Sequence, residues 1–491
     1  MKQKKLKSHS KSLISNSKLA TFFNRFFLPL AILIIASGFF LRIWQVDQPS
    51  RYIFDEDFHA FTAGQTIDHL NLMFEWWHPP YPQNINQYTY RPPAIEWLHP
   101  PVAKYIWRQS IILFGNHPFA WRLPSVIFGT LNVGLIIWLV FILTQHKGLS
   151  LLAGLILALE KLSLTQSQIA MNDIFLTSWL MLATIFYLLA QTKKASTMSH
   201  QQTQRSQAKG FKSYFSKISQ TQNIKPLIIM LSAIFLGLAT ATKWTGFWVL
   251  PVFLVHYVVT QVQNTKLKRY KHQSMAAAHV KSTNSDFNGI KRVWHHQSTL
   301  ISSFFYFLII PVAIYLLAYS PLLTAPNGWN QFAQLHQEII HYQRTTDFSH
   351  PHASQAWQWA YGQKPVYYAL KANGDNINRV AQINPLLAIV LTGGFFFSLG
   401  LILIRITNQS LVKQKKLKIL NSQLATFNSK LKTTNFSFFI LIFLLIGALW
   451  LPWFFISRPK FIYYMTPVVP FLVANLMLTA NFSRQFFLRK K

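Results

Sequence analysis

Three adjacent carboxyl side chains, Asp55, Glu56 and Asp57, stand out in a strongly basic chain, which has 13 acidic and 47 basic residues. Phe54 and Phe58 flank them four positions apart, so on a helix both rings would share one face and leave Asp55 and Glu56 off it. A carboxylate placed there could activate a hydroxyl as a general base. The same acids could instead lie in a solvated loop, or cap a helix that begins near Asp57.

Further candidates lie at the ends of long apolar runs. Asp173 begins one run, where a carboxylate close to hydrocarbon needs a partner, although it could also serve as a helix N-cap. Arg122, Lys243 and Arg458 lie at other run ends, where a cation can bind a carboxylate or a phosphate or simply anchor the interface. His99 precedes two prolines that permit a helix start, and we interpret it as part of a structural re-entry into the membrane.

The apolar runs identify the class of protein. A soluble chain would have about a quarter of its residues charged, but here 12% are charged and 51% are hydrophobic. The hydrophobic residues form blocks of about 17 to 25, long enough to cross a bilayer. We therefore predict an all-α polytopic membrane protein. Its expected spans are residues 26–44, 120–143, 149–165, 173–191, 226–242, 244–260, 299–318, 386–405, 436–456 and 462–480.

Basic residues gather in alternate segments between these spans. Such segments contain most of the 47 basic residues but, among the acids, only Asp286. This positive-inside pattern predicts that both termini are cytoplasmic. Anionic lipid headgroups account for the net charge of +34, so nucleic acid is not an expected partner. The predicted cytoplasmic segments are the tail 1–25, the loops 192–225, 261–297 and 406–435, and residues 481–491, of which 486–491 form the C-terminal tail.

Two long segments, 45–119 and 319–385, then face the outside of the cell membrane, within a single membrane domain over 26–485. The first contains seven of the 13 acidic residues, and the second is rich in aromatic residues and histidine. We expect any chemistry to be extracytoplasmic. The length of the first apolar run and the missing A-x-A site predict a retained span rather than a cleaved signal peptide.

Several kinds of site have no support in the sequence. The chain lacks a Walker motif, a dinucleotide-type glycine pattern and H-E-x-x-H, so nucleotide and zinc-protease chemistry are not indicated. It has no cysteine, which excludes disulfides and thiolate metal sites. A divalent metal could assist the departure of a phosphate, but no clear set of ligands is visible.

Motifs in order from residue 52 to about residue 470 resemble the protein O-mannosyltransferase family. The resemblance implies a C-type glycosyltransferase fold with about 10–11 transmembrane helices and two large extracytoplasmic loops. It also implies inverting transfer of mannose from a dolichyl- or polyprenyl-phosphate donor to Ser or Thr hydroxyls of an exported protein. The matching motifs are Phe54-Asp55-Glu56, His99-Pro100-Pro101 with Lys104, Trp121-Arg122-Leu123-Pro124-Ser125 with Gly129, Ala170 to Leu176 around Asp173, Lys243-Trp244-Thr245-Gly246, and His350-Pro351-His352-Ala353-Ser354 with Trp357 and Trp359.

The resemblance also assigns roles. Asp55 would be the base that acts on the acceptor hydroxyl, with Glu56 supporting it, and Arg122 would hold either the acidic motif or the donor. The residues implied near the donor phosphate are Asp173, Lys243 and Arg458. Those implied to shape the acceptor or sugar site are His99, His350, Ser354 and Trp357.

Some features depart from the family pattern. Gln168 stands where the family commonly has arginine, and Asp57 is an extra acid. The second outer loop has no room for the trefoil domain of eukaryotic members, which implies a bacterial or archaeal type, and the chain ends about one span early. Two alternatives stay open: a transferase of the same fold that modifies a lipid or wall glycan, and a transporter or flippase for lipid-linked sugars. The flippase predicts ionisable residues inside the spans, whereas here they lie mostly at span ends.

Overall fold

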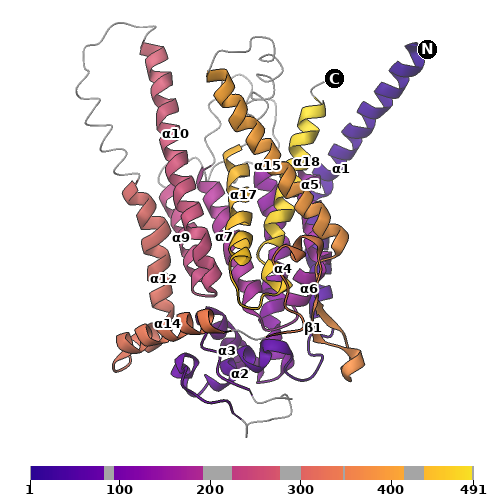
Figure 1. The fold of residues 1–491 in the computed structure, drawn as a ribbon. Helices are drawn as coiled ribbons and strands as arrows, with labels where there is room; N and C mark the ends of the chain where they lie inside the picture. The colour runs from indigo at the N-terminus through magenta and orange to yellow at the C-terminus, as the bar shows by residue number, and fades with distance from the viewer. Residues whose placement is uncertain are drawn as a thin grey trace.

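The computed structural model describes residues 2–81, 93–191, 224–276, 300–346, 349–413 and 436–488. Most of the predicted loops 192–225, 261–297 and 406–435 lies outside these ranges. Each of the ten expected spans contains a helix, and these helices run side by side as one bundle (Figure 1). They are α1 (Lys2–Ile43), α4 (Pro118–Thr144), α5 (Lys147–Leu159), α7 (Asn172–Gln191), α9 (Lys225–Thr240), α10 (Leu250–Ala276), α12 (Ile310–Ala318), α15 (Pro385–Lys413), α17 (Phe436–Trp450) and α18 (Val469–Leu488).

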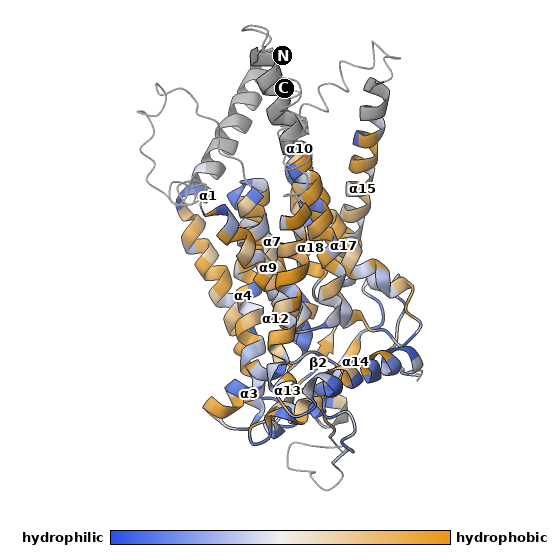
Figure 2. Ribbon diagram, turned by 90° about the vertical axis from the view of Figure 1, so that its left-hand side faces the viewer, coloured by the Kyte–Doolittle hydropathy of each residue, from blue (hydrophilic) through white to orange (hydrophobic). Residues whose placement is uncertain are grey.

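Within the described ranges, seven helical segments are both long and apolar enough to cross a membrane. The helices α5 and α9 are apolar but shorter, and α18 is not among the seven. An apolar run in hydrocarbon folds as a helix because only then are its backbone groups satisfied within the run. Figure 2 shows apolar residues along the outward faces of the bundle. Large apolar side chains of α1 are exposed, among them Leu28, Ile32 and Phe40. A surface of this kind requires lipid, so the chain is a multi-pass membrane protein.

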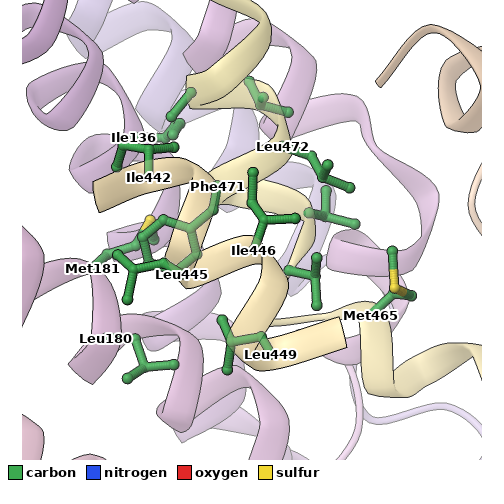
Figure 3. Close-up of a cluster of buried hydrophobic side chains, with 14 of the residues drawn as sticks. Ile136, Leu180, Met181, Ile442, Leu445, Ile446, Leu449, Met465, Phe471 and Leu472 are labelled. Atoms are coloured by element: carbon green, nitrogen blue, oxygen red, sulfur yellow. The ribbon is translucent and has the colours of Figure 1, made fainter. Parts of the chain in front are cut away.

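The interior of the bundle is packed with aliphatic side chains where α17 and α18 meet α4 and α7 (Figure 3). Leu445 and Ile446 of α17 lie against Phe471 and Leu472 of α18, and all four are at most 1% exposed. This close-packed core fixes the short 3-10 segment η8 (Ile462–Met465), which directly precedes α18 and contains Tyr463 and Tyr464.

The ends of the bundle differ. Both termini lie at one end, as the charge pattern predicts (Figure 1). The other end carries η1 (Phe54–Asp57), α2 (His59–Gln65), η2 (Leu70–Phe74), α3 (Val102–Phe114), α13 (Ser320–Leu323), α14 (Gly328–Thr345) and the hairpin of β1 (Val366–Ala369) and β2 (Arg379–Ala381). The α3 helix starts directly after the two prolines, as expected. The antiparallel hairpin, with Val366 opposite Ala381, was not predicted, because strands of three or four residues leave little periodic signal.

Candidate active site

A buried ion pair organises the segment that carries the acidic motif. Arg122 of α4 and Glu56 of η1 are both 0% exposed. The guanidinium donates from Nε to Glu56 Oε1 at 2.9 Å and from Nη2 to Oε2 at 2.7 Å. The backbone N–H groups of Ala170 and Ile53 also donate to this carboxylate, at 3.0 and 3.1 Å. Glu56 is therefore satisfied on both oxygens, and its position is that of a structural anchor.

The same guanidinium also holds the chain that leads into the motif. Its remaining N–H groups donate to the carbonyl oxygens of Val46 (3.0 Å), Pro49 (2.9 Å) and Arg51 (2.7 Å). A planar group with a fixed fork of donors can join several acceptors in this way, whereas a lysine could not. Of the two roles implied for Arg122, the structure places it at the acidic motif.

The tight turn η1 separates the neighbouring acids. Phe54 has a positive φ of 51°, which is uncommon for a residue with a side chain. Its ring packs against Tyr368 and Tyr463, with centroids 4.6 and 5.7 Å away. In the 3-10 turn that follows, Glu56 is turned inward to Arg122, whereas Asp55 lines a cavity. The anchor and the candidate base are thus adjacent in sequence but face different surroundings.

This cavity has a volume of about 640 Å³ and is lined by residues from the end of the bundle opposite the termini. Six of the predicted site residues line it, whereas Glu56, Arg122, Ser354 and Trp357 do not. Segments far apart in the sequence contribute to its wall. The predicted residues in the lining are Asp55, His99, Asp173, Lys243, His350 and Arg458.

Asp173, which was expected to need a partner because it lies close to hydrocarbon, is paired with Lys243. Lys243 Nζ lies 2.8 Å from both carboxylate oxygens of Asp173, and both side chains are at most 8% exposed. Asp173 comes from the first turn of α7, and Lys243 precedes η3 (Trp244–Val249). The Lys243 ammonium also lies 4.9 Å from the ring centre of Tyr464. Because the two charges cancel, this pair adds little net charge to the cavity.

Arg458 differs from Lys243 in this respect. Its guanidinium carbon lies 5.8 Å from the ring centre of Trp453 and 5.9 Å from that of Tyr464, and the side chain is only partly buried. Among the residues the structure describes, no carboxylate forms an ion pair with it. It is therefore the cation of the cavity wall best able to bind an incoming anion.

A second polar cluster forms the wall next to His59. Glu96 Oε1 lies 2.8 Å from His99 Nδ1, and Glu96 Oε2 lies 2.8 Å from the ammonium of Lys104. Lys104 also donates to the His99 carbonyl at 2.7 Å. Burial opposes ionisation of Glu96, but the nearby Lys104 ammonium and His99 outweigh it and hold the pKa of Glu96 below its usual range. Burial lowers the pKa of His59 to about 3, against the attraction of Glu96, so this ring is neutral at pH 7.

Of the described residues, His59, Glu96 and His99 have the donor atoms and the proximity that a metal ion requires. Two imidazoles and a carboxylate suit zinc or another transition metal. However, Lys104 already places a positive charge 2.8 Å from the same carboxylate. A divalent cation there would be repelled by this ammonium. The cluster has its own internal cation, and we assign no step of the chemistry to a metal.

Ser354 and Trp357 lie away from the cavity lining. Ser354 Oγ accepts a hydrogen bond from Trp359 Nε1 at 2.8 Å, and its backbone N–H donates to the carbonyl of Lys460, also at 2.8 Å. These bonds join the segment 319–385 to the stretch that carries Arg458. Trp357 is 52% exposed. A direct role of either residue in sugar binding stays a prediction.

Sequence reasoning left out three residues that the structure makes prominent. Glu96 and Lys104 form the core of the polar cluster. In the sequence, Lys104 stood out only as part of the His99-Pro100-Pro101 motif, and Glu96 only as one of the acidic residues of its segment. Arg379 of β2 is 8% exposed and donates to the side-chain oxygen of Gln168 and to the carbonyl of Gln45. Gln168 stands where the resemblance led us to expect an arginine. The guanidinium at this place therefore belongs to Arg379, which is 211 residues away in the sequence. A local motif contains no signal for such a pairing.

Comparison with known proteins gives a consistent result. Residues 32–324 match the family model described as dolichyl-phosphate-mannose-protein mannosyltransferase. A polyprenol-phosphate-mannose–protein mannosyltransferase of Mycolicibacterium smegmatis is 22% identical over 302 residues, 56% of this chain and 53% of the relative. One from Corynebacterium glutamicum is 22% identical over 300 residues, 55% of this chain and 52% of the relative. The chain thus spans about half the length of the curated relatives it matches.

Structural similarity extends further along the chain. The protein O-mannosyltransferase Pmt1-Pmt2 complex of S. cerevisiae, solved with its sugar donor bound, superposes with a TM-score of 0.61 at 11% identity. The match covers 93% of this chain and 85% of that one. At this level of identity the likeness establishes the fold, and it confirms the C-type glycosyltransferase fold expected from the motifs.

Proposed function

Because the chain belongs to the dolichyl-phosphate-mannose-protein mannosyltransferase family, we propose that it transfers mannose from a polyprenyl-phosphate donor to Ser or Thr hydroxyls of exported proteins. The observation that carries the proposal is the cavity that combines the carboxylate of Asp55 with the guanidinium of Arg458. A base for a hydroxyl and a cation for a phosphate are the two groups that this transfer needs.

In the proposed mechanism, Asp55 accepts the proton of the acceptor hydroxyl while the hydroxyl oxygen attacks the anomeric carbon of the donor sugar. The new carbon–oxygen bond forms as the bond between that carbon and the phosphate oxygen breaks. The phosphate leaves with the negative charge, which Arg458 stabilises. A single displacement of this kind inverts the anomeric configuration. Glu56 and Arg122 hold Asp55 in place, and the Lys243–Asp173 pair shapes the wall near the phosphate.

We further propose that the site faces the outside of the cell membrane. The support is the positive-inside pattern together with the position of η1 and α3 at the end of the bundle opposite the termini. In this arrangement, residues 45–119 and 319–385 are the two outer segments of a single domain over 26–485. The half-buried His350 at the cavity wall would contact the acceptor, which arrives from the aqueous side.

A transfer assay with an Asp55→Asn variant tests the function. Purified protein in lipid is given labelled polyprenyl-phosphate-mannose and a Ser/Thr-containing peptide, and mass spectrometry locates the added hexose. Since general-base catalysis contributes about 10²- to 10⁴-fold, we expect Asp55→Asn to lose at least about a hundredfold in kcat. Asp68→Asn, an exposed acid of the same outer segment, is the matched control and should keep wild-type activity.

The outcomes separate the candidate functions. Near-normal transfer by Asp55→Asn would show that Asp55 is not the general base. If the wild-type protein gives no hexose on the peptide but adds one to an envelope lipid, the lipid-glycan alternative replaces protein transfer. Mass spectrometry of secreted proteins from cells with and without the gene gives the same answer in vivo.

A further inference from the structure

The wall formed by His59, Glu96, His99 and Lys104 takes no part in the mechanism above, although it lines the cavity or lies directly behind its lining. Glu96 is 5% and Lys104 1% exposed. The His99 side chain is 27% exposed. Burying an ionised pair is costly unless the pair is well compensated. The buried Glu96–Lys104 pair lies next to the partly exposed imidazole of His99, which points to a function for this imidazole.

The cluster fixes the tautomer of His99. Glu96 is a carboxylate and can only accept, so the hydrogen on the His99 ring must be on Nδ1, which lies 2.8 Å from Glu96 Oε1. In the neutral ring, Nε2 then carries a lone pair and is an acceptor. Within the described residues, the hydrogen bonds of His99 involve Nδ1 and the backbone but not Nε2. Nε2 is thus left to accept from a donor in the cavity.

The ring is also held rigidly. The His99 N–H donates to Glu96 Oε1 at 2.9 Å, and the His99 carbonyl accepts from Lys104 at 2.7 Å. The Glu96 N–H is bound in turn to Thr62 Oγ1 at 2.7 Å, and the ring of His59 packs against that of His99 with centroids 5.6 Å apart. A preorganised acceptor of this kind gives specificity because it cannot move to suit a ligand that lacks the matching hydroxyl.

We infer that His99 Nε2 accepts a hydrogen bond from a hydroxyl group of the donor hexose and so selects the sugar. This inference rests on the proposed function. The hexose is favoured over the acceptor because the wall behind His99 is almost fully buried, and the sugar must leave water before it reacts. The partly exposed lining residues Gln343, His350 and His352 come from the second outer segment, and a protein acceptor would approach from that side. Glu96 and Lys104 act as positioning residues for His99.

The test compares donors that each lack one hydroxyl. Polyprenyl-phosphate-mannose and its 2-, 3-, 4- and 6-deoxy analogues are assayed with the wild-type protein and with His99→Phe. We expect the wild type to discriminate against one deoxy donor by about 10- to 100-fold in kcat/KM, the cost of leaving one acceptor unpaired. His99→Phe should use unmodified polyprenyl-phosphate-mannose about as poorly as the wild type uses that deoxy analogue. The variant should no longer discriminate against the analogue. The control His69→Phe, an exposed histidine away from the cavity lining, should keep the wild-type pattern.

Each other result counts against the inference. Equal use of all four deoxy donors by the wild type overturns it without any variant. So does an unchanged discrimination pattern in His99→Phe, or a change confined to the KM of the acceptor peptide. If the Phe variant does not fold, His99→Asn keeps a polar but shorter side chain, and the same loss of discrimination is expected. A wild type that uses no polyprenyl-phosphate-mannose at all would overturn the proposed function as well, which makes the two failures distinguishable.

Discussion

Replacing Arg122 by glutamine tests whether this residue positions the base or binds the donor. In the structure, its guanidinium makes two hydrogen bonds to the buried Glu56 and three to backbone carbonyls of residues 46–51. Removing one partner of a buried ion pair leaves an uncompensated charge and costs about 3–5 kcal/mol. Arg122→Gln should therefore lower the free energy of unfolding by about that amount.

The double variant Glu56→Gln/Arg122→Gln separates the charge from the packing. It removes both charges, so its loss in free energy of unfolding should be smaller than the sum of the losses of the two single variants. The difference is the coupling energy, which is about 0.5–3 kcal/mol for residues in one network. Lys371→Gln, an exposed basic residue of the second outer segment, is the control and should be near neutral.

The assay combines equilibrium unfolding in mixed micelles with transfer kinetics on the variant that remains folded. A positioning role predicts a loss in kcat, because Asp55 moves with its anchor, and a donor KM close to that of the wild type. The reasoning is refuted if Arg122→Gln is as stable as the wild type. It is also refuted if the variant keeps kcat and raises the donor KM alone, since Arg122 would then bind the phosphate.

Two further predictions concern charge at the cavity. Arg458→Gln should lower kcat/KM for the donor by about tenfold, equivalent to about 1.4 kcal/mol for one charge-assisted contact to the phosphate, and an unchanged kcat/KM would contradict this. His59 has its pKa lowered from 6.5 to about 3 by burial, so the unfolded chain binds a proton more readily. Its contribution to stability is therefore present above pH 6.5 and lost as pH falls toward about 3. Thermal unfolding between pH 7 and pH 4 should show a steeper decline for the wild type than for His59→Phe, and equal slopes would refute it.

The membrane helices could be predicted from the sequence because the length of an apolar run and the charge of its flanking segments act locally. The structure places a helix in each expected span, and both termini lie at the same end of the bundle. The need of Asp173 for a partner was also visible, since a carboxylate at that depth cannot stay unpaired. The short hairpin of β1 and β2 was missed because too few residues alternate in it.

The sequence determined by itself which residue types lie at which depth, and its motifs indicated where chemistry would gather. Only the tertiary structure decided the partners: Glu56 pairs with Arg122 across 66 positions, and Asp173 pairs with Lys243 across 70. It also separated Asp55, which lines the cavity, from its neighbour Glu56, which anchors the turn. The physical reason is that an ionic contact depends on distance in space, and the packing of the helices sets that distance independently of the order of residues along the chain.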